Sequence, residues 1–177
     1  MSDETAAEPS ICIGCGLCCD GTLFVRGKLT PDEASKIPAA HKVTGVSEGE
    51  QVSFRQPCVH FDGSGCRIYS DRYAACRKYR CEVLKAHEEG LLDSATARGR
   101  ISEARDLIEA VTSVDPEARS WAARRRLWNE LAEAVKDATG PERAALGRRL
   151  LNVVALDAFL DKHFRKKADE GDRTGKA

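Results

Sequence analysis

The sequence predicts an α+β fold, mainly α, in which a small cysteine-rich domain precedes a helical hairpin or three-helix unit. Two observations support this prediction. All eight cysteines of the 177-residue chain lie between Cys12 and Cys81, and apolar residues recur at helical spacing from about Ser94 onward. The expected units are a disordered tail over residues 1–10, the cysteine-rich domain over 11–90, the helical domain over 94–168 and a second disordered tail over 169–177.

The elements expected in the cysteine-rich domain are short. Residues 22–29 (TLFVRGKL) and 52–55 (VSFR) have the β-branched and aromatic content of strands. Residues 61–66 (FDGSGC) contain two glycines and predict a turn. A helix that carries the last two cysteines is expected to begin near Asp71 and to continue without a break toward His87.

Thr30 marks the start of another helix, between the two predicted strands. Its side chain is placed to cap the helix, Pro31 occupies the first helical position, and Glu33 completes a capping box. Pro38 limits this helix to about two turns.

Three apolar faces are predicted in the helical half, and we interpret them as core rather than as a ligand pocket. Asp115-Pro116 marks the start of one helix, and Gly140-Pro141 ends one helix and opens the next. The basic run ARRRLW, residues 123–128, lies among acidic residues and predicts a solvated helix face. The faces are formed by Ile101, Ala104, Ile108 and Val111; by Trp121, Trp128, Leu131 and Val135; and by Leu146, Leu150, Val153, Leu160 and Phe164.

Composition limits the classes of partner. Lys plus Arg and Asp plus Glu both number 28, so the formal net charge is zero. A chain without a net positive field is not expected to bind nucleic acid nonspecifically. No apolar run approaches the roughly 20 residues that cross a bilayer, and the amino terminus lacks the pattern of a signal peptide. We therefore expect a cytoplasmic protein without a membrane partner, and the sequence leaves a protein partner open.

The first four cysteines are unusually close together. In CIGCGLCC, Cys12 and Cys15 are three positions apart across a short turn, so both thiolates can face one ion, and the glycines permit positive φ angles. The adjacent Cys18 and Cys19 are hard to place on one tetrahedral ion, because neighbouring side chains diverge. This pair indicates two neighbouring sites or a cluster.

The remaining cysteines, Cys58, Cys66, Cys76 and Cys81, complete a set of eight. Cytosolic thiols are kept reduced, so metal ligation is favoured over the alternatives of four disulfides or independent free thiols. Eight thiolates satisfy two tetrahedral sites, or one iron–sulfur cluster with four thiolates left for another role. Basic residues interleaved with this group either lower the thiol pKa values or keep an exposed helix hydrated; they are Arg67, Arg72, Arg77, Lys78 and Arg80.

Three other side chains lie near the second group. His60 offers an alternative to one thiolate ligand, and Tyr69 and Tyr79 are expected to pack over the site with their rings. No partnership between a cysteine and a histidine is readable in the sequence, so a catalytic cysteine is not predicted.

The cysteine pattern resembles a known family. CxxCxxCC followed by PCxxFxxxxCxIYxxRxxxCRxYxC is similar to the bacterial zinc- or iron-chelating domains called CxxCxxCC or YkgJ-like proteins, over about residues 12–81. The resemblance implies that all eight cysteines are metal ligands. One position departs from the family pattern: Tyr73 follows Arg72 where the family usually has proline. This change is expected to loosen the start of the helix that carries Cys76, without loss of a ligand.

The pattern and the resemblance together predict a protein that chelates zinc, as two ions, or iron through eight thiolates. Its expected role is non-enzymatic: structural, storage or interaction. The alternative is an iron–sulfur protein in redox or protein-modification chemistry, which is supported by the family's iron option, the ferredoxin-like spacing of the first three cysteines and the adjacent Cys18 and Cys19. One branch of the family resembles the much longer flagellin lysine N-methylases. No glycine-rich nucleotide-binding loop supports that activity here. Without metal, we expect the cysteine-rich domain to be poorly folded.

Overall fold

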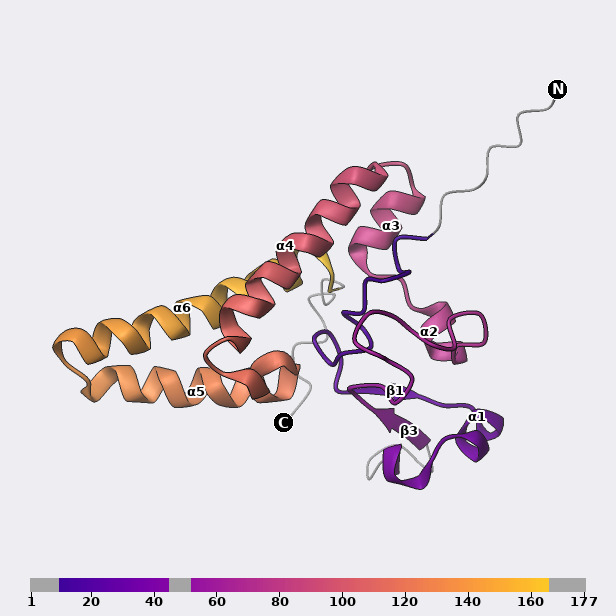
Figure 1. The fold of residues 1–177 in the computed structure, drawn as a ribbon, viewed down its shortest axis with the longest axis horizontal. Helices are drawn as coiled ribbons and strands as arrows, with labels where there is room; N and C mark the ends of the chain where they lie inside the picture. Colours follow the sequence, from indigo (N-terminus) through magenta and orange to yellow (C-terminus); the bar gives the residue numbers. More distant parts are fainter. Residues whose placement is uncertain (1–9, 45–51, 166–177) are drawn as a thin grey trace, which may run out of the picture.

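The structure, a computed structural model, describes residues 10–44 and 52–165 (Figure 1). The predicted tails lie outside these residues, except for Ser10. The α+β class with mainly helical structure is confirmed. The elements in chain order are β1 (Arg26–Lys28), α1 (Pro31–Lys36), the 3-10 helix η1 (Ala39–His41), β2 (Lys42–Thr44), β3 (Val52–Arg55), α2 (Ala74–Lys78), α3 (Glu82–Glu88), α4 (Ser94–Thr112), the 3-10 helix η2 (Pro116–Arg119), α5 (Trp121–Asp137) and α6 (Gly140–His163).

The three strands form a small antiparallel sheet with β3 in the centre. Ser53 of β3 lies opposite Lys28 on one side and Val43 on the other. The predicted strand at 52–55 is confirmed, whereas the one at 22–29 is too long. The chain before β1 turns into the core instead, where the N–H of Leu23 donates to the carbonyl of Leu17 at 3.1 Å. The strand β2 was not predicted.

The capping box at the start of α1 is confirmed. The Thr30 hydroxyl accepts the N–H of Glu33 at 3.3 Å, and the Glu33 carboxylate accepts the N–H of Thr30 at 2.9 Å. The second oxygen of Glu33 accepts the N–H of Ala74 at 2.6 Å. This side chain therefore also joins α1 to the first turn of α2, next to Tyr73.

The prediction of one unbroken helix from Asp71 toward His87 is wrong. The chain forms α2 and α3, with extended backbone at Tyr79 and Cys81 between them. The Tyr79 ring packs edge-on against Phe24 at 4.7 Å between centroids, and its hydroxyl donates to the carbonyl of Phe164 at 3.3 Å. The Cys81 sulfur accepts the N–H of Leu84 at 3.4 Å and so caps α3. These long-range contacts favour the break over a continuous helix.

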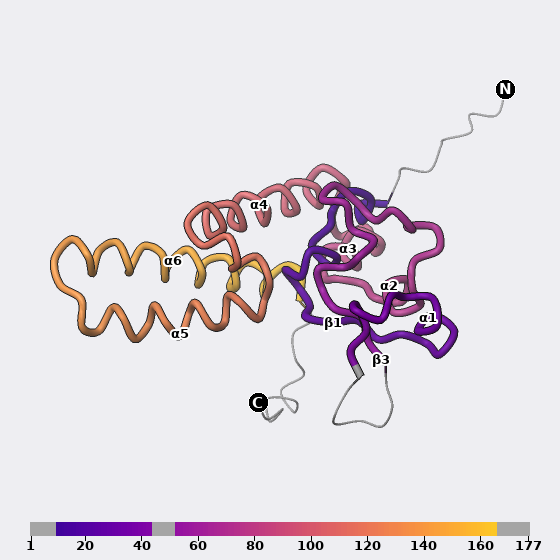
Figure 2. Tube along the Cα trace, turned by 60° about the horizontal axis from the view of Figure 1, so that its bottom comes forward, coloured from indigo at the N-terminus to yellow at the C-terminus, as the bar shows by residue number. Residues whose placement is uncertain are grey.

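In the helical half, α5 and α6 form an antiparallel hairpin, and α6 lies between α5 and α4 (Figure 2). The predicted boundary at Gly140-Pro141 is confirmed. The helix start predicted at Asp115-Pro116 is the 3-10 turn η2, and α5 begins only at Trp121, where the Ser120 hydroxyl accepts the N–H of Ala123 at 3.2 Å. Within the described ranges, no helix combines the length and apolar character that a membrane span needs.

Two clusters of buried residues are present. The larger one, called here the main core, joins Leu17 and Leu23 to Val83 of α3 and to the inner faces of α4 and α6. The smaller one, called the small core, contains Phe54, Tyr73 and four other residues between α1, β3 and α2. The main core thus crosses the predicted boundary between the two domains, and the division at residues 90–94 stays a prediction.

The predicted apolar faces of α4 and α6 are largely buried, but the face assigned to α5 is partly wrong. Leu131 is buried, whereas Trp128 is 45% exposed. The buried stripe of α5 runs instead through Arg124, Leu127 and Leu131. Trp128 lies one residue, about 100°, round the helix from that stripe.

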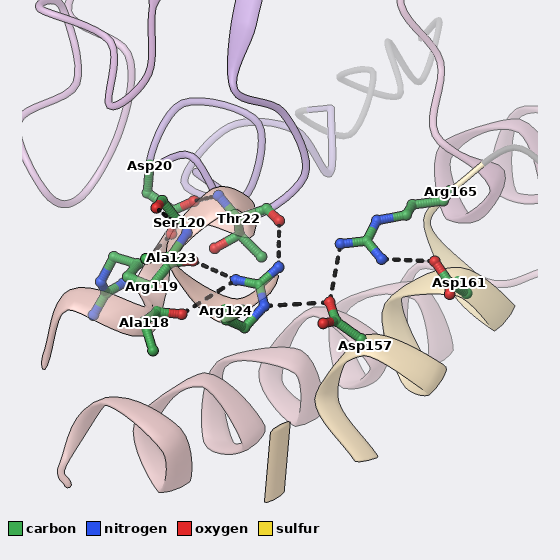
Figure 3. A network of polar contacts seen from close by, with 10 residues as sticks. All are labelled: Asp20, Thr22, Ala118, Arg119, Ser120, Ala123, Arg124, Asp157, Asp161 and Arg165. Carbon is green, nitrogen blue, oxygen red and sulfur yellow. Dashed lines mark hydrogen bonds and ion pairs between the residues drawn. The ribbon is translucent and has the colours of Figure 1, made fainter. Parts of the chain in front are cut away.

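The prediction that the basic run is wholly solvated is wrong for Arg124, whose side chain is fully buried. Figure 3 shows the polar contacts of this side chain. Its guanidinium donates to Asp157 of α6 at 3.2 Å and to the carbonyl of Thr22 at 2.8 Å. Asp157 also pairs with Arg165 at 3.1 Å. Nearby, the N–H of Trp121 donates to the carbonyl of Gly21 at 3.0 Å. These contacts fasten the segment that directly follows the first cysteine group to α5 and α6.

Candidate metal centre

All eight cysteines line one cavity of about 390 Å³. All eight are free thiols, and each is buried or partly buried. The fold therefore brings the two cysteine groups together, although they are about 40 residues apart in the sequence. Their role as ligands stays a prediction. The lining cysteines are Cys12, Cys15, Cys18, Cys19, Cys58, Cys66, Cys76 and Cys81.

The first group is held in tight turns. The N–H of Cys15 donates to the carbonyl of Cys12 at 3.1 Å, and the N–H of Cys19 donates to the carbonyl of Gly16 at 2.8 Å. Gly16 has φ of 75°, and a Cβ there would lie 2.9 Å from the Phe61 ring. The positive φ predicted for a glycine in this segment is confirmed.

Arg105 of α4 anchors the first group from outside. Its guanidinium donates to the carbonyl of Cys15 at 3.0 Å and also to the carbonyl of Gly14. A charged donor on backbone oxygens is a strong form of hydrogen bond. The helical half thus fixes the position of the cysteine turn.

The second group is positioned by one backbone contact with the first group and by contacts within its own turn. The N–H of Cys58 donates to the carbonyl of Cys19 at 2.7 Å, which places these two cysteines side by side. Cys66 forms an isolated β-bridge with Phe61 and closes the predicted turn. Within this turn, the Asp62 carboxylate accepts the N–H of Gly65 at 2.8 Å. The turn is therefore confirmed.

Electrostatic contacts divide the thiols into two sets of four. The thiol of Cys18 interacts most strongly with Cys15 and Cys81, then with its chain neighbour Cys19, and least with Cys12. The thiol of Cys19 interacts instead with Cys66, Cys58 and Cys76. We call Cys12, Cys15, Cys18 and Cys81 the first set, and Cys19, Cys58, Cys66 and Cys76 the second set.

Packing separates seven of the cysteines in the same way. Every member of the first set packs against the main core. In the second set, Cys58 belongs to the small core, and Cys19 and Cys76 pack against it. The adjacent Cys18 and Cys19 therefore contact different cores, as expected if they serve neighbouring sites.

Burial raises the pKa of several of the thiols. It raises the pKa of Cys15 and of Cys19 to about 12 and that of Cys76 to about 11, and nearby thiols add to each effect. Desolvation also raises the pKa of Cys18 well above its ordinary value. A cation in the cavity would offset the cost of the buried thiolates.

The predicted effect of the basic residues on the thiols is outweighed. Arg72 lowers the pKa of Cys76, but burial and the neighbouring thiols raise it by more. The other bases contact different partners: Arg67 donates to the carbonyl of Val59 at 2.9 Å, and Arg80 pairs with Glu88 at 3.1 Å. These side chains mainly fix loops and helix ends.

The aromatic residues enclose the cavity. Tyr69 and Tyr79 line it, as predicted, and so does Tyr73, which the sequence analysis did not assign to the site. Tyr73 is buried, and its hydroxyl lies 2.9 Å from Nε2 of His60. His60 is therefore engaged with a tyrosine and does not line the cavity. The only signal for Tyr73 in the sequence was its departure from the family pattern.

The donor chemistry of the cavity fits zinc or iron. Eight soft thiols belong to the residues that line one cavity. Gln56 also lines it, and its buried side-chain oxygen has no hydrogen-bond partner among the described residues; a half-turn of the amide would present its N–H donors there. In the parts of the chain that the structure describes, no three His, Cys, Asp or Glu side chains are yet arranged as ligands of one ion. Binding thus requires the cysteine side chains to turn toward shared centres.

Comparison with known proteins agrees with this chemistry. Residues 11–103, just over half of the chain, match the family described as "CxxCxxCC: Putative zinc- or iron-chelating domain". No curated protein and no solved structure matches the chain. The match includes all eight cysteines and extends into α4. The chain therefore belongs to the CxxCxxCC family of zinc- or iron-chelating domains.

Proposed function

We propose that this protein binds zinc or iron through the thiolates of its eight cysteines, and that the metal holds the cysteine half in its folded form. The observation that carries the proposal is that all eight cysteines line one cavity. The role is non-enzymatic: structural, storage, or presentation of a surface to a protein partner. Closed four-thiolate sites leave no open position for a substrate, which supports this role.

The size of the local elements supports a stabilising metal. Strands of three or four residues and helices of five to seven make up the cysteine half. Ordering one residue costs about 1–2 kcal/mol of backbone entropy, and among the described residues the small core contains six buried ones. Structural zinc contributes on the order of 10–16 kcal/mol in small zinc-dependent folds. Metal binding can therefore supply the missing stability.

An iron–sulfur protein is the second candidate. The observation in its favour is that all eight thiols face a single cavity of about 390 Å³, which has room for more than two bare ions. A cluster held there would supply electron-transfer or redox chemistry. Its biological role would then be redox or protein modification.

The metal content of the protein separates these candidates. The protein is purified without oxygen, and zinc, iron and acid-labile sulfide are counted per chain together with the visible absorbance. We expect a colourless protein with about two zinc ions. Iron with acid-labile sulfide and broad visible absorbance would support the second candidate. A folded protein with neither metal, which also takes up neither on reconstitution, would contradict both.

A further inference from the structure

We propose that the eight cysteines form two separate four-thiolate sites, in which the first set binds one metal ion and the second set binds another. The inference rests on the proposed function, because it assigns the ligands of that site. It commits to mononuclear sites and against one cluster shared by both sets. Cys18 and Cys19, although adjacent in the chain, are assigned to different ions.

The divergence of the adjacent pair is the first argument. Cys18 packs against the main core beside the buried Leu17. The carbonyl of Cys19 accepts the N–H of Cys58 at 2.7 Å, and both Cys19 and Cys58 lie at the small core. The backbone between the two residues thus runs along the boundary between the sites.

The break between α2 and α3 is the second argument. Cys76 stays on α2, where it packs at the small core with Tyr73. Cys81 lies beyond the break at the N-terminal cap of α3, whose Val83 and Leu84 are in the main core. The N–H of Glu82 donates to the carbonyl of Phe164 at 3.2 Å, which fixes this end of α3 to the end of α6. The break therefore places Cys81, the last cysteine, with the first set.

The distribution of charge is the third argument. A zinc ion bound by four thiolates carries two excess negative charges, so two such sites side by side need positive charge near each. Arg105 donates to the carbonyl of Cys15 in the first set at 3.0 Å, and Arg72 lines the cavity together with Cys76 of the second set. The Arg72 guanidinium is held 4.0 Å from the centroid of the Tyr69 ring. Each set therefore has a guanidinium of its own.

The most direct test uses the wild-type protein loaded with cadmium-113, a spectroscopic substitute for zinc. Through-bond correlations between each cadmium nucleus and the cysteine β-protons assign every ligand. We expect two cadmium resonances, one correlated with Cys12, Cys15, Cys18 and Cys81, and the other with Cys19, Cys58, Cys66 and Cys76. A cadmium nucleus correlated with members of both sets, or a thiolate shared between two nuclei, would overturn the assignment. Absence of bound cadmium would refute the proposed function, and the assignment with it.

Paired substitutions give an independent test by zinc stoichiometry. The variant Cys15→Ser/Cys81→Ser alters only the first set, Cys58→Ser/Cys76→Ser alters only the second, and Cys15→Ser/Cys76→Ser alters one ligand of each. We expect about one zinc ion per chain in the first two variants, and markedly weakened binding of both ions in the third. Loss of all zinc from every variant that retains its helical circular dichroism would overturn the inference in favour of one shared centre.

Discussion

The cysteine half and the helical half differ in what holds their backbones in place. Helices of 17 to 24 residues form the helical half, and their hydrogen bonds lie within each helix. Elements of the cysteine half have at most seven residues. Its turns have their own backbone hydrogen bonds, and side chains of the helical half hold it in addition, through Arg105 at the first cysteine group and Arg124 at Thr22. The helical half can therefore be specified by its local sequence pattern, whereas the cysteine half depends on its thiols and on contacts with side chains of the helical half.

The same contrast applies to the two sets of cysteines. The first set packs on the main core, which α3, α4 and α6 also build. The second set packs on the small core, which only short elements enclose. We therefore expect the second set to depend more on bound metal than the first.

Removal of metal should have the largest effect on the difference in stability between the two halves. Each metal site contributes on the order of 10 kcal/mol to the free energy of unfolding. When both sites are emptied, the loss exceeds the typical total stability of a domain, about 5–15 kcal/mol. Thermal melting with and without a strong chelator should show loss of the cooperative transition of the cysteine half. Chelator already saturated with zinc is the control. Unchanged cooperative melting after verified metal removal would contradict the prediction.

Substitution of Arg124 should have the next largest effect, because Arg124 joins the two halves. In Arg124→Met, the carbonyl of Thr22 loses its charged donor and Asp157 keeps only Arg165. Breaking a buried ion pair costs about 3–5 kcal/mol. The matched control is Arg126→Met in the same basic run, where the side chain is exposed and a change within about 0.5 kcal/mol is expected. Equal free energies of unfolding for the two variants, measured in urea, would show that Arg124 does not stabilise the contact between the two halves.

A smaller effect is expected from Glu33, which acts inside the cysteine half only. In Glu33→Ala, the N–H groups of Thr30 and Ala74 lose their acceptor. The expected loss is about 1–2 kcal/mol, as for an N-terminal cap. Asp32→Ala, an exposed acid in the same helix, is the control and should change stability less. The idea fails if urea unfolding shows the control to be as destabilised as the variant.

The smallest effect concerns the pKa of Asp62 in the turn before Cys66. The N–H groups of Ser64 and Gly65 and the Ser64 hydroxyl donate to its carboxylate and lower the pKa to about 2. Because the folded pKa lies below the unfolded value of about 3.9, the contribution to stability is present above about pH 4 and is lost as the pH falls toward 2.

An NMR titration of the Asp62 side-chain carboxyl carbon checks this value. Asp62→Asn keeps an oxygen acceptor but does not titrate, so it identifies the signal. A midpoint near the ordinary value of about 4 would show that the turn does not hold the carboxylate.

Features that depend on nearby residues were predicted from the sequence. The capping box needs only Thr30 and Glu33, and the turn at residues 61–66 needs only its own glycines and aspartate. Convergence of the cysteine groups on one cavity was anticipated from their number and spacing together with the family resemblance.

Features that depend on distant residues were not predicted from the sequence. Burial of Arg124 requires Asp157 and the carbonyl of Thr22, which are 33 and 102 residues away. The break after α2 requires Phe24 and Phe164, and neither is indicated by the local helical pattern around Tyr79. The assignment of each cysteine to a set depends on that break, so it could not be predicted from the sequence either.

Amide hydrogen exchange, read by mass spectrometry on metal-loaded and metal-depleted protein, decides whether metal holds the cysteine half while the helices hold themselves. After verified metal removal, protection should be lost over residues 10–44 and 52–81 and kept in α4, α5 and α6. Unchanged protection over residues 10–44 and 52–81 would contradict this.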